Sequence, residues 1–234
     1  MTKLVDLVGL ENRRTFGFLD DFCVEIVTGD LWTTVLTDTG TAAVGDAAGG
    51  IASLVPSDGT VADNDEAYLK TTNELFKFAA DKPAIFEVRA QYTEANTDDA
   101  NVAFGFMDAV AANAILDNGA GPAASYSGAL FFKVDGGTTW NCETSIAGAQ
   151  TTTALTAAQG GTAGGASYKT FRITFDPYSS TAAKVNFFID GVLMASHDFT
   201  YTSATEMCAF AGVKNGGTNL ETLNVDYIAA YQLR

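Results

Sequence analysis

The chain has 234 residues, of which 47% are hydrophobic and 11% aromatic, which is enough to build a core and excludes a disordered chain. Its formal net charge is −15 and its isoelectric point lies near 4.2. Because nucleic-acid backbones and anionic membrane surfaces are also negative, we expect neither as a partner. The first residues contain no apolar signal-peptide core, and no apolar run reaches the ~18 residues that span a bilayer.

The three cysteines, Cys23, Cys142 and Cys208, are widely separated in the sequence. An odd number without a C-x-x-C spacing argues against a disulfide framework and for synthesis in a reducing compartment. We expect these thiols to behave as small buried hydrophobic groups.

The first 16 residues differ from the rest because they form the only stretch of this acidic chain that leans basic. Their apolar residues follow no firm period. Three interpretations remain open: an irregular first strand, a frayed terminus, and an arm that docks on a partner. In the last case the expected contact residues are Lys3, Leu4, Leu7, Arg13 and Arg14.

The remaining chain consists of short apolar or alternating runs separated by turn signals, which predicts strands from end to end. Residues 109–117 are the one segment for which we expect a short helix. The expected strands are 18–26, 31–36, 51–55, 63–69, 75–78, 84–92, 102–107, 128–134, 138–144, 169–176, 184–189, 192–198, 207–213 and 223–231.

Asp190-Gly191 gives the strongest local signal, because a two-residue type I′ turn needs φ > 0 at both central positions. The flanking runs alternate, with Val185, Phe187 and Ile189 on one face. Together with residues 169–176 they are expected to form the middle of an antiparallel sheet.

On the order of a dozen short strands at these spacings predict an all-β fold, an antiparallel β-sandwich or jelly roll. The sequence has no polar linker and no fixed-period repeat. We therefore expect an N-terminal arm over residues 1–16 and one sandwich domain over residues 17–234.

The sequence contains few residue patterns that indicate a catalytic site. Asp38-Thr39-Gly40-Thr41 matches the aspartic-protease signature, but that chemistry needs two such aspartates and one copy is present. Glycosidases need two carboxylates across a cleft, whereas Glu87 stands alone on its strand. His197 is the only histidine, and its neighbours in the sequence point away from it in a strand. We assign no catalytic residue and expect that the protein is not an enzyme.

Metal and cofactor sites are not indicated by the spacing of the ligand residue types. The run Asp63-Asn64-Asp65-Glu66 is rich in oxygen ligands, but it lacks the separated spacing of an EF-hand, and a solvated turn is the favoured interpretation. Whether it binds calcium stays open. We expect no cofactor and no metal ligand. Trp32 and Trp140 are equally compatible with a sugar platform and with the core.

Three segments together resemble the concanavalin A-like (laminin-G-like) jelly-roll proteins. They are Phe171–Phe175, the hairpin start Val185–Gly191, and the closing strand Leu223–Ile228. The resemblance implies the fold, a concanavalin A-like jelly roll, and says little about activity.

A narrower resemblance, to tailed-bacteriophage virion proteins of this fold, rests on Phe18–Phe22, Trp32, Gly49-Gly50, Asp63–Leu69 and the ending Val225–Arg234. It implies a structural capsid decoration (cement) protein that binds the outer surface of the major capsid protein and stabilises the shell. It also implies a homotrimer on the virion surface, synthesised in the host cytoplasm. The alternative on the same fold is a carbohydrate-binding adhesin or a head- or tail-fibre module with a glycan as its partner. A divergent polysaccharide hydrolase or lyase is the third hypothesis.

Overall fold

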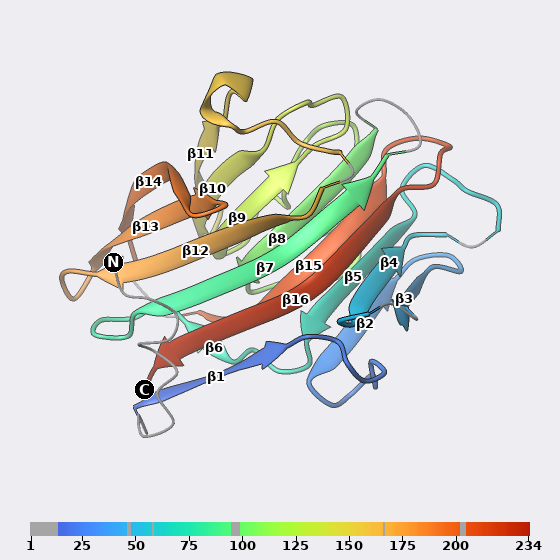
Figure 1. Cartoon of the computed structure of the whole chain (residues 1–234). Coiled ribbons are helices and arrows are strands. Elements are labelled where there is room, and N and C mark those ends of the chain that lie inside the picture. Colours follow the sequence, from blue (N-terminus) through green and yellow to red (C-terminus); the bar gives the residue numbers. More distant parts are fainter. Residues whose placement is uncertain (1–13, 46–47, 58, 95–98, 166, 202–204) are drawn as a thin grey trace.

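The computed structural model describes residues 14–45, 48–57, 59–94, 99–165, 167–201 and 205–234. These residues fold into two antiparallel sheets that stack as a sandwich, which confirms the predicted all-β jelly-roll class. Figure 1 shows the two sheets one behind the other. A short 3-10 turn lies at Ala157–Gln159. The described residues contain no helix long and apolar enough to cross a bilayer.

Sheet A lies in front in Figure 1, with β7 and β16 at its centre. Two strands share one side of β16. Strand β4 pairs with its beginning, at residues 223–225, and β1 (Thr15–Asp20) pairs with its end, at residues 228–233. In spatial order the strands are β14 (Val192–Thr200), β13 (Ala182–Ile189), β12 (Lys169–Pro177), β7 (Ala84–Thr93), β16 (Thr222–Leu233), β4 (Ile51–Val55) and β3 (Thr41–Gly45).

Sheet B lies behind sheet A, and β6 (Phe76–Lys77) pairs with one end of its strand β15. In spatial order the strands are β11 (Ala149–Ala154), β10 (Asn141–Ile146), β9 (Gly128–Lys133), β8 (Ala100–Met107), β15 (Glu206–Asn215), β5 (Glu66–Thr71) and β2 (Trp32–Leu36).

The core lies between the sheets because alternate side chains of each strand point inward. Phe171 and Phe175 of β12 are at most 2% exposed and pack on aromatic rings from other elements. The ring of Phe171 lies 4.6 Å from that of Phe104 in sheet B, and Phe175 stacks on Phe78 at 4.3 Å. Each buried ring of this size contributes on the order of 2–3 kcal/mol, so these contacts hold the layers together.

The outer face of sheet B is covered by residues 108–127, named here the covering segment. Its side chains Val110, Ile115 and Tyr126 are buried in a second apolar cluster with sheet B residues that include Tyr68 and Phe210. The predicted helix over 109–117 is therefore wrong, since the segment runs as bends across the sheet. The apolar residues of the covering segment are placed where they contact the sheet. They do not recur with the 3.6-residue period that would form one apolar face of a helix.

A buried charged pair fastens the covering segment to sheet B. The Lys214 ammonium donates to Asn113 Oδ1 at 2.8 Å and to the Ile115 carbonyl at 3.2 Å. The backbone N–H of Asn113 donates to Glu66 Oε1 at 2.8 Å, and Glu66 Oε2 lies 3.7 Å from Lys214 Nζ. Asn113 itself has φ of 62°, a conformation that asparagine tolerates better than most residues. The outer face of sheet B is thus closed by the chain itself.

The hairpin at Asp190-Gly191 is confirmed. The two residues have φ of 49° and 79°, as a type I′ turn requires, and they join β13 to β14. The expectation that this hairpin forms the middle of the sheet is wrong, because β14 is the edge strand of sheet A. The centre is made instead by β7 and β16, whose pairing joins segments far apart in the sequence.

The first strand ends earlier than the predicted 18–26, because the chain turns after Asp20. The carboxylate of Asp20 accepts from the Phe22 N–H at 2.9 Å and from Trp32 Nε1 at 2.6 Å. Phe22 adopts φ of 51° and is fully buried, whereas Val24 is 74% exposed.

The predicted arm lies mostly outside the described residues, and so do Lys3, Leu4, Leu7 and Arg13. Of the expected contact residues, Arg14 is described: it is exposed, and its carbonyl accepts from the backbone N–H of Arg234 at 2.6 Å. Thr15 and Phe16 belong to β1. The division into an arm and a sandwich domain stays a prediction, as does the contact role.

Candidate functional site

The outer face of sheet A is the open broad face of the described sandwich, because the covering segment occupies the outer face of sheet B. Two adjoining hollows lie on it, of about 320 Å³ and 560 Å³. Both are lined by Ile85, Thr174 and Asp176, so they form one depression over β7, β12 and β13. We call this depression the sheet A hollow. A surface depression that combines apolar walls with a few convergent polar groups is the usual form of a ligand site.

Polar side chains from three strands meet in the sheet A hollow, because strand register sets them side by side. Asn186 of β13 lies opposite both Thr174 of β12 and Ser196 of β14. Asn186 Nδ2 donates to Asp176 Oδ2 at 3.0 Å, and Thr174 Oγ1 donates to the same oxygen at 2.7 Å. Ser196 Oγ donates to Asn186 Oδ1 at 2.8 Å. These bonds fix the amide and the carboxylate while leaving further acceptor capacity on Asp176.

Apolar side chains flank this polar group. Phe188 lines the hollow and is partly exposed, and Ile85 forms part of its floor. Leu193, opposite Phe188 in the register, is 53% exposed. The pleat places Phe188 outward, while its neighbour Phe187 is buried between the sheets. An accessible ring beside fixed acceptors can contact a ligand that has both an apolar face and polar edges.

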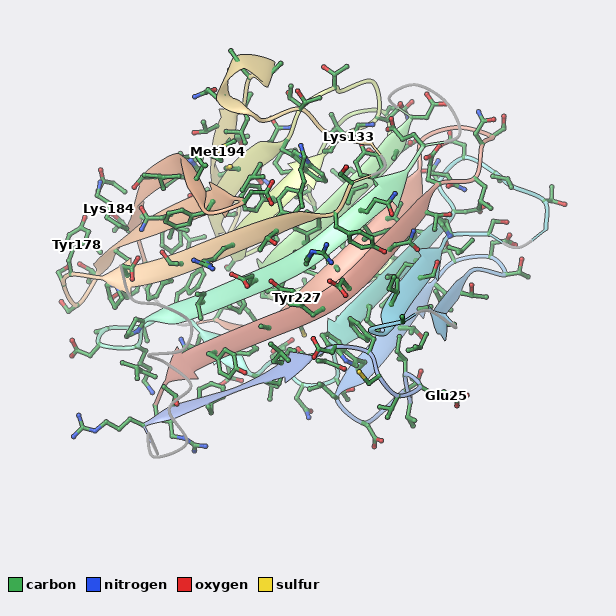
Figure 2. The ribbon with its side chains drawn as sticks, in the orientation of Figure 1. Glu25, Lys133, Tyr178, Lys184, Met194 and Tyr227 are labelled. Carbon is green, nitrogen blue, oxygen red and sulfur yellow. The ribbon has the colours of Figure 1, made fainter. Side chains whose placement is uncertain are left out.

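A band of charged residues continues the hollow toward the centre of sheet A. Arg172 of β12 lies opposite Glu87 of β7 and forms an ion pair with it. The hydroxyl of Tyr227 on β16 donates to the other oxygen of Glu87 at 2.7 Å. Figure 2 shows Tyr227 over the centre of the sheet. Burial, and then the bond to Glu87, raise the pKa of Tyr227 well above its ordinary value, so the phenol stays a neutral donor.

A second ion pair, between Arg89 and Asp226, lies next to the first. A β-bulge in β16 between Val225 and Tyr227 makes Asp226 an extra residue, which brings its carboxylate to the same face as Arg89. The guanidinium of Arg89 also lies 4.8 Å from the ring centre of Tyr168. Glu87 is the one carboxylate of β7, as the sequence predicted, and the bulge in the neighbouring strand adds Asp226 to the same face.

Figure 2 shows Lys184 of β13 and Tyr178 at the other end of this face, toward the β14 edge of the sheet. Lys184 Nζ lies 2.7 Å from Asp198 Oδ1, and both side chains are largely exposed. The Tyr178 hydroxyl lies 3.4 Å from the same oxygen, and its side chain adds an exposed ring. The outer face of sheet A thus carries aromatic and polar groups across its width.

The residues that the sequence singled out for other chemistry are in structural roles. Trp32 and Trp140 are each 3% exposed and belong to the core, so neither forms a surface platform. Asp38 occupies a turn with φ of 57°, where its carboxylate accepts from Ser57 Oγ at 3.1 Å. His197 is buried between the sheets, between the hydroxyls of two threonines.

The oxygen-rich run Asp63–Glu66 does not converge on one point. Asp65 Oδ2 accepts from the Ala62 N–H at 2.8 Å, while Glu66 lies under the covering segment. Within the described ranges, no group of three or more histidine, cysteine or acidic side chains is placed to hold a metal ion. A separate cleft beside Trp140 and Tyr92 has a volume of about 10 Å³, which is room for about one water molecule.

No protein-family model and no curated protein sequence matches the chain. Solved structures do resemble it. The Emp47p carbohydrate recognition domain has a TM-score of 0.57 at 14% identity, over 93% of this chain and 94% of that one. An endo-1,3-beta-glucanase from Streptomyces sioyaensis has 0.56 at 16%, over 94% and 97%. A carbohydrate esterase, vb_24B_21, from the Shiga toxin-encoding bacteriophage phi24B has 0.50 at 14%, over 86% and 89%.

These likenesses establish the jelly-roll fold that is common to lectin-type domains and to enzymes acting on glycans. The prediction that the protein is not an enzyme is contradicted by this set of neighbours, among which are a glucanase, an esterase, a lyase and an endo-galactosidase. That prediction relied on missing sequence motifs, and the structure gathers Glu87, Asp226, two arginines and Tyr227 on one face without any such motif. The identities are too low to carry an activity to this chain.

Proposed function

We propose that the protein binds glycans in the sheet A hollow. The observation that carries the proposal is the open depression in which Phe188 adjoins the fixed Asn186–Asp176 pair. A sugar ring has hydroxyl groups around its edge and C–H bonds on its faces, so it needs such acceptors beside an aromatic or aliphatic surface. Recognition of carbohydrate in the Emp47p domain, which has a similar fold, supports this choice of ligand.

The expected affinity is modest. Each hydrogen bond to a neutral group contributes about 0.5–1.5 kcal/mol, and one to a charged group about 1.5–3 kcal/mol. Part of that gain is offset by the loss of translational and rotational freedom on association. A hollow with a few such contacts supports a dissociation constant of roughly micromolar to millimolar for a single oligosaccharide. Several copies acting together would raise the apparent affinity.

The decisive experiment is a glycan-array screen followed by calorimetry with the best oligosaccharide. Phe188→Ala removes the ring surface and is expected to weaken binding by about 10- to 30-fold, which corresponds to about 1.4–2 kcal/mol. Asn186→Ala removes an amide from the hollow and is expected to have a similar effect. Val192→Ala, a 60% exposed residue on the same hairpin that does not line the hollow, is the matched control. Unchanged binding in both hollow variants would refute the location.

A second candidate function is capsid decoration. We propose it on the resemblance of the sequence to tailed-phage virion proteins, supported by a bacteriophage protein among the structural neighbours. In this role the chain is synthesised in the host cytoplasm and binds the outer surface of the major capsid protein on the virion as a homotrimer. The proposed contact residues are Lys3, Leu4, Leu7, Arg13 and Arg14.

Removing residues 1–13 tests this second role, because the described sandwich begins after them. The truncated protein is expected to stay folded and to lose attachment to purified particles. Unchanged attachment would contradict the contact role. Light scattering of the full chain tests the trimer, and a monomer at micromolar concentration would contradict it.

A further inference from the structure

We infer that the sheet A hollow selects uncharged glycans and rejects uronate-containing ones. This inference rests on the proposed glycan binding and adds the charge class of the ligand. It comes from how the charges on this face are already paired.

The cation that lines the hollow, and two further cations on the outer face of sheet A, are each paired with a carboxylate of the same face. Arg172 pairs with Glu87, and it is the one cationic side chain in the described lining. Farther out, Arg89 pairs with Asp226 and Lys184 with Asp198. An anionic sugar would have to compete with these carboxylates for a cation. Arginine recognises a carboxylate best through a free planar fork, and both arginines are already engaged.

Two carboxylates of the lining, by contrast, have no cationic partner. Asp176 accepts from Thr174 and Asn186, both neutral. Asp81 lines the larger half of the hollow and does not take part in the ion pairs among the described residues. The lining itself is therefore net negative, because it holds these two carboxylates beside the neutral Arg172–Glu87 pair, and the whole chain carries a formal −15. Like charges brought together in a binding site lower the affinity for an anionic ligand, whereas the same carboxylates accept hydrogen bonds from neutral hydroxyl groups.

The test compares ligands that differ only in charge. Hexamers of β-1,3- and of β-1,4-linked glucose are measured by calorimetry against the same chains oxidised at C6 to glucuronate. At low salt the neutral hexamer is expected to bind at least about tenfold more tightly than its oxidised form. The difference should shrink in ~0.5 M salt, because ions screen exposed charges.

Asp176→Asn and Asp81→Asn are expected to narrow the preference for the neutral hexamer, since each removes one negative charge and keeps the shape. Glu25→Gln removes the same charge on the opposite side of the molecule from Lys184, as Figure 2 shows, and should leave the preference unchanged. Circular dichroism confirms that each variant is folded.

The outcomes separate the two proposals. Equal or tighter binding of the uronate would overturn the charge preference and leave glycan binding intact. An unchanged preference in the Asp176→Asn and Asp81→Asn variants would also overturn it, because the selectivity would then come from elsewhere. Failure of every hexamer to bind, together with a blank glycan array, would remove the proposed function, and the charge preference with it.

Discussion

His197 and Thr144 join the two sheets of the sandwich. His197 Nδ1 on β14 of sheet A lies 3.0 Å from Thr144 Oγ1 on β10 of sheet B, and its other ring nitrogen lies 2.9 Å from Thr153 Oγ1. The imidazole also packs against the ring of Phe187, with ring centres 5.2 Å apart. The only histidine of the chain is therefore a buried cross-link between layers.

This placement predicts a pH dependence of stability. Burial holds the pKa of His197 below its ordinary value near 6.5. As the pH falls, the imidazole therefore becomes protonated in the unfolded chain at a higher pH than in the folded protein. Above about pH 6.5 the contribution of His197 to the free energy of unfolding is constant. As the pH falls from there to the folded-state pKa, the protein loses stability.

Urea unfolding at pH 7.5 and pH 5.5 measures this loss. The wild type is expected to lose up to about 1 kcal/mol more than His197→Gln, which does not take up a proton in this window. Equal losses in the two proteins would show that His197 does not titrate differently on folding.

Lys214 and Glu66 give a second prediction, since both side chains are at most 1% exposed. Lys214→Met removes one buried charge, leaves Glu66 unpaired and loosens the covering segment, and we expect a loss of about 3–5 kcal/mol. Lys214→Met combined with Glu66→Gln should cost less than the sum of the two single changes. A double-mutant cycle by chemical denaturation measures this coupling, and strict additivity would contradict it.

Gly105 of β8 is expected to tolerate no side chain. A Cβ at this position would lie 2.2 Å from the Ala129 carbonyl oxygen of the neighbouring strand, and φ is 145°. Gly105→Ala should destabilise the protein by about 3 kcal/mol or more, or prevent folding. Gly136→Ala is the control: φ is 73° there and nothing lies within 4 Å of the added Cβ, so its cost should be about 1 kcal/mol. Similar melting temperatures for the two variants would contradict the packing argument.

Asp190 stabilises the hairpin in two ways, through its backbone conformation and through its carboxylate, which accepts from the Thr170 N–H at 2.9 Å. Asp190→Ala is expected to cost about 1–2 kcal/mol, because alanine loses this acceptor and disfavours φ > 0. Asp190→Asn keeps an acceptor oxygen and the tolerance for positive φ, so thermal unfolding should show a loss below about 0.5 kcal/mol. A larger loss for asparagine than for alanine would contradict this explanation.

The sequence predicted the elements that depend on local patterns. The alternation of apolar and polar residues and the turn residues Asp190-Gly191 were sufficient to predict this hairpin, because a type I′ turn accepts only a few residue types. The helix predicted over 109–117 failed because an apolar segment packed on a sheet face needs no helical period. The early end of the first strand also escaped prediction, since it depends on a contact between Asp20 and the distant Trp32.

The candidate site was harder to foresee because it depends on strand register. Glu87 and Asp226 come from segments far apart in the sequence, and only the pairing of β7 with β16 brings them to one face. One local signal was present: in the closing strand the inward positions shift from Leu223 and Val225 to Ile228 and Ala230. Such a change of parity indicates a bulge, and here it turns Asp226 outward.

The most direct test of the central claim is a two-dimensional NMR titration of the full chain with the oligosaccharide that binds best in the array. Glycan binding in the sheet A hollow predicts that the largest shift changes fall on the amides of Thr174, Asn186 and Phe188, and that the Phe188→Ala variant loses them. Changes confined to the covering segment and to the outer face of sheet B, around Tyr68 and Phe210, would contradict the claim.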